Sequence, residues 1–84
     1  MKNIKQTKLN HRDVQLPIIV EKDEDGFYVV ECPVLEGCYT QGSSLDEALK
    51  NIREVIDLVR DEKENQEILI SYKPLEISFH TISV

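Results

Sequence analysis

Few residues in this chain have the type and spacing that chemistry requires. Nucleophilic catalysis needs a serine or cysteine beside a histidine that acts as its base. The two histidines, His11 and His80, lie far from each other in the sequence and far from Cys32 and Cys38. A lone histidine in a polar alternation is typical of an exposed or rim position, and we interpret His80 in that way. We therefore predict no catalytic residue and no enzyme activity.

The two cysteines bracket a short loop that begins at Pro33. Structural zinc sites use cysteine pairs with closer spacing, and the C-x5-C spacing of Cys32 and Cys38 does not match them. The sequence shows no secretory signal peptide, so we expect a cytoplasmic protein in which thiols stay reduced. We predict two free thiols, buried or at an edge, with no metal and no cofactor.

Four carboxylates gather around one glycine of the sequence: Glu21, Asp23, Glu24 and Asp25. A calcium-binding EF-hand loop that began at Asp23 would need glycine at its sixth position and glutamate at its twelfth. Those positions hold Tyr28 and Val34. We interpret the cluster as a solvated acidic turn and not as a metal site.

The charge of the chain is uneven. The 84 residues include 10 Lys or Arg and 16 Asp or Glu, for a net charge of −6. Residues 1–12 contain four basic residues and no acid, so removing their +4 from −6 leaves −10 for the remainder. Such a body repels phosphate backbones, so we expect no direct nucleic-acid binding by this chain. The excess of acidic side chains would attract a basic protein, or would only keep the domain soluble.

The domain organisation follows from length and charge. We predict a flexible basic N-terminal arm over residues 1–15 and a single domain over residues 16–84. A chain this short buries only about 60–65% of the surface that its unfolded form exposes, so it is marginally stable alone and oligomerisation would stabilise it. No apolar run approaches 18 residues, which excludes a membrane-spanning helix. The tyrosines do not form a stacking platform among basic residues: Tyr28, Tyr39 and Tyr72.

Three strands and one helix would position these residues. Leu16–Lys22 and Phe27–Cys32 are rich in β-branched and aromatic residues, and the Asp25-Gly26 pair between them is a strong hairpin signal. Cys38–Gln41 is the predicted third strand. Alternation along the second strand would place Tyr28, Val30 and Cys32 on one face, and Phe27, Val29 and Glu31 on the other.

The helix is predicted from about Leu45 to Glu62. Ser44 is a suitable N-cap, and Glu47 could reach back to the Ser44 N–H in a capping box. Leu58 lies off the apolar stripe, at the rim of the core or in an oligomer contact. The stripe itself follows i, i+3, i+4 spacing and would pack on the sheet: Leu45, Ala48, Leu49, Ile52, Val55, Ile56 and Val59.

The remaining residues suggest one more strand. Lys63–Glu67 is predicted to be a polar connection, and Ile68–Tyr72 a short strand or extended arm. Leu75–Val84 alternates as a final strand, although Ile82 and Val84 fall on the face opposite to Leu75, which favours a bulge or a second apolar surface. The predicted fold is α+β with the order β-β-β-α-β, one helix packed on a small, mostly antiparallel sheet.

Three runs of residues carry a family resemblance: Ile19–Val29, Leu35–Ser44 and Asp46–Ile52. Together they resemble the HicB-like antitoxin family, over Pro17 to about Glu62. The run Gly37-Cys38-x-Thr40-Gln41-Gly42 is the most specific part, and Glu36 departs from the pattern where a second proline is usual. The resemblance implies a β-β-β-α-β fold that looks like a truncated RNase H fold without its catalytic carboxylates.

The resemblance also implies a function. It implies an antitoxin-like protein-binding domain that neutralises a small basic RNA-cleaving toxin of the HicA type. Because the chain ends at Val84, we expect a short form that lacks the C-terminal DNA-binding domain of many members. The alternative is a stand-alone homodimer or homotetramer with a structural or regulatory role and no toxin. A nuclease with RNase H chemistry is disfavoured, because the carboxylates are not placed across separate strands.

Overall fold

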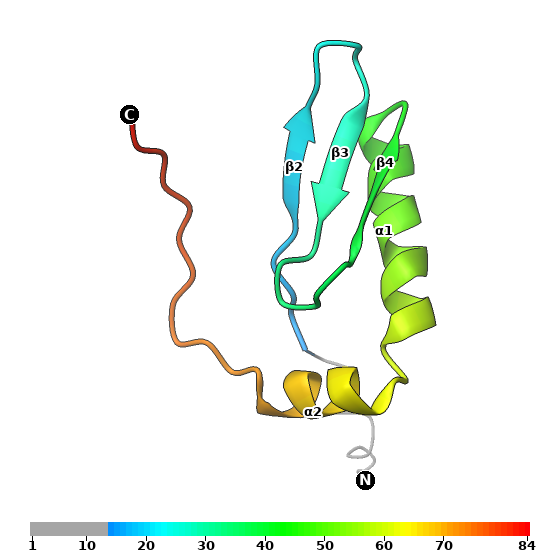
Figure 1. The fold of residues 1–84 in the computed structure, drawn as a ribbon, viewed down its shortest axis with the longest axis vertical. Helices are drawn as coiled ribbons and strands as arrows, with labels where there is room; N and C mark the ends of the chain where they lie inside the picture. The colour runs from blue at the N-terminus through cyan, green and yellow to red at the C-terminus, as the bar shows by residue number, and fades with distance from the viewer. Residues whose placement is uncertain (1–13) are drawn as a thin grey trace, which may run out of the picture.

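A small antiparallel sheet and two helices form the part of the chain that the structure describes. This computed structural model describes residues 14–84, with β2 (Ile19–Lys22), β3 (Tyr28–Glu31), β4 (Tyr39–Gly42), α1 (Leu45–Val59) and α2 (Lys63–Ser71). The sheet has the order β2-β3-β4, both pairs are antiparallel, and α1 packs along one side of it (Figure 1). The α+β class is confirmed, and the observed order is β-β-β-α-α.

The acidic turn between β2 and β3 has a structural role. The carboxylate of Asp23 accepts hydrogen bonds from the N–H groups of Asp25, at 3.0 Å, and Phe27, at 2.9 Å. The N–H of Asp23 donates to the Phe27 carbonyl at 2.8 Å, and Gly26 adopts a φ of 90°, which its missing Cβ allows. The predicted hairpin is confirmed, with an exposed acidic tip.

The core lies between the sheet and α1. Val20, Val30 and Thr40 are partners across the three strands and share the face that α1 covers. The predicted alternation along β3 is confirmed, because Val30 and Cys32 are fully buried while Val29 and Glu31 are exposed. The buried residues are Val30, Cys32, Leu35, Cys38, Ala48 and Ile52.

The start of α1 matches the predicted cap in one of its two bonds. The Ser44 hydroxyl accepts from the N–H of Glu47 at 3.1 Å, so Ser44 is the N-cap. The Glu47 carboxylate, however, accepts from the N–H and the hydroxyl of Ser43, the latter at 2.6 Å. The reciprocal bond predicted to Ser44 therefore lies one residue earlier. These bonds hold the pKa of Glu47 below its usual range.

The second helix corrects two predictions. The first helix ends at Val59 and not at Glu62, and Lys63–Ser71 then forms α2, where a polar connection and a strand were predicted. Asn65 explains the change, because its side-chain amide donates to the Val59 carbonyl at 2.8 Å and to the Glu62 carboxylate at 3.3 Å. These bonds close the turn between the helices. The Leu69 side chain then packs against the core cluster.

The predicted final strand, Leu75–Val84, is also wrong as a paired strand of this sheet. We call these residues the C-terminal segment. They are extended and exposed, and they run past β2 without joining the sheet (Figure 1). The physical reason is α2, which uses the residues that would otherwise return the chain to the sheet.

The predicted basic arm covers residues 1–15, and residues 1–13 of it lie outside the described residues. No helix within residues 14–84 is long and apolar enough to cross a membrane.

Candidate protein-binding surface

The junction of β4 and α1 holds the sheet in place. A Cβ atom added at Gly42 would lie 2.5 Å from the backbone nitrogen of Ala48, so only glycine allows this approach. The side-chain amide of Asn51 donates to the Gln41 carbonyl at 2.8 Å and ties the second turn of α1 to the same strand. The face of the sheet opposite α1 is therefore presented on a rigid support.

That opposite face carries six side chains in two rows across the strands, and we call it the outer sheet face. Its members alternate with the residues that face α1. The register pairs Ile19 with Glu31 and Glu31 with Tyr39. The second row, by the same pairing, consists of Glu21, Val29 and Gln41.

The outer sheet face combines carboxylates with exposed apolar groups. Glu21 and Glu31 are exposed, Val29 is partly exposed, and the Tyr39 side chain has 67% of its surface accessible. Tyrosine is enriched at the centres of protein interfaces, where it combines a large apolar ring with a polar tip. This arrangement suits contact with a protein that presents cations around an apolar patch.

The two cysteines do not belong to this surface. Cys32 and Cys38 are free thiols, as predicted, and both are buried. The N–H of Cys32 donates to the Cys38 carbonyl at 2.9 Å and closes the loop between them. Burial, and then the proximity of Cys32, raise the pKa of the Cys38 thiol. A buried thiol with a raised pKa is a weak nucleophile, so its role is in packing.

His80 lies on the C-terminal segment and is exposed, as predicted. The Ser78 hydroxyl lies 2.8 Å from the His80 Nε2 atom, so the structure does bring a serine beside a histidine. Both side chains face water, and a catalytic pair needs a third group that orients the base. Nothing in residues 14–84 gathers three or more His, Cys, Asp or Glu side chains that could hold a metal ion.

The tyrosines are separated by the sheet. Tyr28 is half-buried on the α1 side, where the Lys22 ammonium lies 5.4 Å from the centre of its ring. Tyr39 lies on the outer sheet face. Sequence reasoning did not select Tyr39, and the signal that could have found it was the alternation along Tyr39–Gly42.

A groove lies beside the chain that leads into β2, and we call it the β2 groove. It encloses about 400 Å³ between Leu16 and Ile18 on one side and Leu49 and Ile56 of α1 on the other. The apolar side chains at this edge of the sheet are therefore incompletely covered.

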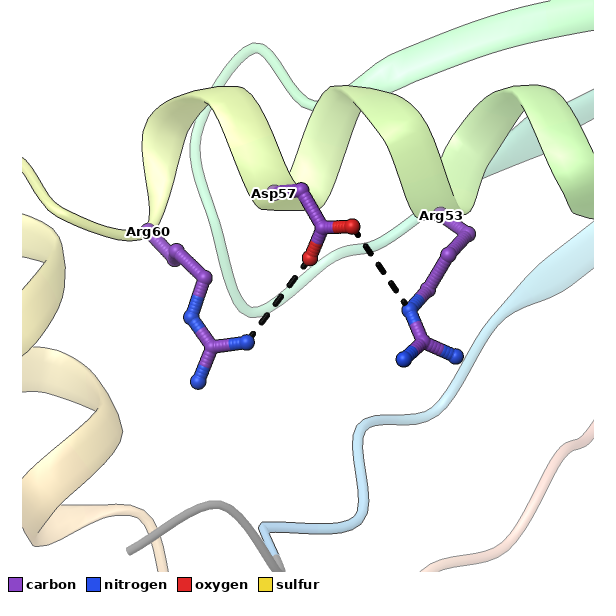
Figure 2. Close-up of polar contacts among 3 residues, drawn as sticks. All are labelled: Arg53, Asp57 and Arg60. Carbon is purple, nitrogen blue, oxygen red and sulfur yellow. Dashed lines mark ion pairs between the residues drawn. The ribbon is translucent and has the colours of Figure 1, made fainter.

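Charged side chains of α1 line one end of the β2 groove. Arg53 and Arg60 reach towards Asp57 from neighbouring turns, with closest N···O distances of 3.8 and 3.7 Å (Figure 2). All three groups are at least one-third exposed, so each pair contributes less than about 1 kcal/mol. These pairs therefore add little to stability, but they place positive and negative side chains beside the β2 groove.

Comparison with known proteins adds an independent finding. The model of the family described as "HicB_like antitoxin of bacterial toxin-antitoxin system" matches residues 16–80. This range contains all three strands and both helices.

Individual relatives share the description UPF0150 protein. One from Archaeoglobus fulgidus is 48% identical over 54 residues, which cover 64% of this chain and 78% of the relative. One from Synechocystis is 51% identical over 47 residues, covering 56% and 68%. One from Helicobacter pylori is 40% identical over 67 residues, covering 73% and 92%. No solved structure matches, so the likeness to a truncated RNase H fold stays a prediction.

Proposed function

We propose, from the premise that this chain belongs to the HicB-like antitoxin family, that its folded domain binds and neutralises a small basic RNA-cleaving toxin of the HicA type. The family resemblance expected from the sequence is confirmed by the match over residues 16–80. The observation that carries the finer proposal is the outer sheet face, where the Glu31 carboxylate lies beside the exposed Tyr39 and Glu21 lies one strand further away.

The charge of the domain supports a basic partner. Every aspartate and glutamate within residues 14–84 is exposed, and no charged side chain there is buried. Such a surface speeds the encounter with a cationic protein and disfavours acidic ones. Screening by salt would weaken this attraction.

Neutralisation would follow from competition with RNA. A protein that cleaves RNA must present cations to the phosphates of its substrate. Glu21 and Glu31, on adjacent strands, would offer carboxylates to the same cations. Val29, opposite Glu21, and Tyr39, opposite Glu31, would cover apolar surface next to them. A bound domain would thereby occupy the surface that the toxin needs for RNA.

Charge reversal on the outer sheet face tests this proposal. The test co-expresses the chain with the small basic protein encoded beside it, then measures their affinity and the inhibition of RNA cleavage. The double variant Glu21→Lys, Glu31→Lys should bind at least about tenfold more weakly, because each exposed charge contact contributes up to about 1 kcal/mol. The control Glu54→Lys, Glu67→Lys makes the same change of net charge on the helices.

Two results would count against the proposal. One is the absence of any complex with the neighbouring gene product, and the other is an equal loss of affinity in the helix control. An equal loss would mean that total charge matters and that the outer sheet face does not.

The alternative is a stand-alone homo-oligomeric domain with a structural or regulatory role. The exposed apolar side chains of the C-terminal segment favour assembly with other copies. A chain that assembles and yet protects no RNA from its neighbour's product would support this alternative.

A further inference from the structure

We propose that the C-terminal segment, Leu75–Val84, adds to the sheet of a second copy of this chain, beside β2, so that two copies exchange these segments. This inference does not depend on toxin binding. It rests on two observations. The segment is extended, its apolar side chains are exposed and its backbone makes no hydrogen bonds to other backbone groups of residues 14–84, and the edge of the sheet at β2 has no described strand beside it.

The segment has the properties of a strand that lacks its neighbours. Leu75, Ile77 and Phe79 recur at every second residue, and their side chains are 103%, 56% and 74% exposed. No backbone–backbone hydrogen bond within residues 14–84 involves residues 73–84. Alternating apolar residues in an extended chain bury one face when the segment joins a sheet.

The edge at β2 has the properties of an acceptor. Among the described residues β2 pairs only with β3, so no strand of residues 14–84 lies beside its other edge. A sheet edge of this kind is a template for a further strand. Val20 is 36% exposed, although its partner Val30 on β3, which faces α1 in the same way, is fully buried. A further strand beside β2 would cover Val20 from its open side.

The β2 groove offers space for the side chains of such a strand. Leu49 of α1 is exposed to solvent and Ile56 is half-buried, and both line the groove with Leu16 and Ile18. Leu49 and Ile56 belong to the apolar stripe of α1. The three strands leave both side chains partly open to solvent. A fourth strand would let apolar side chains of the C-terminal segment fill this groove.

The occupant is a second copy because α2 carries the segment away from its own sheet. In Figure 1 the segment leaves α2 at the end of the domain and runs past β2 as a separate ribbon, outside the sheet. Leu75, at its beginning, is fully exposed. Each copy thus has one segment to donate and one edge to accept, and a two-fold pair satisfies both at once.

The size of the contact is adequate for a stable pair. Five large apolar side chains of each segment are exposed: Leu75, Ile77, Phe79, Ile82 and Val84. Two reciprocal strands of this length, with the surface that they cover on β2 and α1, would exceed the roughly 1,000 Å² that specific interfaces need. Backbone pairing along β2 would add the directional bonds that fix the register.

The test compares the full chain with two single variants by light scattering and by amide hydrogen exchange. Ile77→Pro removes an apolar side chain and an N–H from the middle of the segment and fixes its φ at about −65°, away from that of a paired strand, so it should raise the dimer dissociation constant at least about 100-fold. The control Lys50→Ala changes a residue of α1 that is also exposed and does not line the β2 groove, and it should leave the dimer intact. Both substitutions lie at exposed positions, so unchanged helical circular dichroism verifies folding.

Hydrogen exchange identifies the occupant of the edge. In the full chain at micromolar concentration, we expect a mass of two chains. We also expect slow exchange at residues 75–81 and at those N–H groups of Ile19–Lys22 that point away from β3. Both regions should exchange rapidly in the Ile77→Pro variant. A monomeric full chain would overturn the proposal, as would a dimer that Ile77→Pro leaves intact. Slow exchange of the β2 edge in that variant would also overturn it, since another segment would then cover the edge.

Discussion

Replacement of Gly42 by alanine tests how closely β4 and α1 approach each other. The new methyl group would lie 2.5 Å from the nitrogen and 2.8 Å from the Cα atom of Ala48, and 2.9 Å from the carbonyl carbon of Glu47. All three are backbone atoms, so no side-chain rotation relieves the contact. The start of α1 must move outwards until the shortest distance approaches the ordinary 3.4 Å.

The size of the effect follows from that movement. Overpacking in a rigid site costs about 1–3 kcal/mol, and the shift also strains the 2.8 Å hydrogen bond from Asn51 to Gln41, worth about 1 kcal/mol. The lower chain entropy of unfolded alanine offsets about 0.4–1 kcal/mol. We expect a net loss of about 1–3.5 kcal/mol, or a melting temperature lower by roughly 4–28 °C for a domain of this size.

Urea unfolding at one fixed chain concentration measures this loss, because any assembly would make stability depend on concentration. Gly26→Ala is the control. Nothing lies within 4 Å of its added Cβ, and only the φ of 90° opposes it, so the hairpin tip is strained while α1 stays in place. A loss below about 1 kcal/mol for Gly42→Ala would refute the reasoning, because a real clash with backbone costs more.

Three further outcomes are expected at the helix start and in the core. Ser44→Ala should lower the free energy of unfolding by about 1 kcal/mol, since the N–H of Glu47 loses its acceptor, and urea titration would detect this. The pKa of Glu47 is lowered in the folded state, so its ionised carboxylate stabilises the fold fully above the usual carboxyl range, and this contribution is lost as the pH falls through the folded pKa. The variant Glu47→Gln should make the free energy of unfolding less dependent on pH, when unfolding is measured across acidic pH. The thiols of Cys32 and Cys38 should react with an aromatic disulfide at mildly alkaline pH only as fast as the domain opens, and immediate reaction of the folded chain would contradict their burial.

Local signals were sufficient wherever a few neighbouring residues determine the backbone. The Asp25-Gly26 pair predicted the hairpin because glycine accepts the positive φ of the turn. Ser44 predicted the start of α1 because its hydroxyl reaches the next turn. The alternation along β3 predicted which side chains are buried, since the sheet has one covered face.

Prediction failed where the outcome depends on distant partners. Ile68–Tyr72 has strand-forming residues, yet the Asn65 bonds to the preceding turn and the packing of Leu69 favour a helix. Leu75–Val84 has the alternation of a strand, and that pattern specifies an extended backbone but not the strand beside it. The outer sheet face was not selected either: alternation along Tyr39–Gly42 separates two faces, but which of them stays exposed depends on where α1 packs.

The order of the elements along the chain has a consequence for folding. Each strand pairs with the next one in sequence, and α1 packs on the strands that directly precede it. Contacts between near neighbours close small loops, so we expect rapid folding of this part of the domain. During synthesis residues 14–59 leave the ribosome before the C-terminal segment does. The β2 edge would thus form before the C-terminal segment of the same chain can take part, and the segment of another copy could pair with it at that stage.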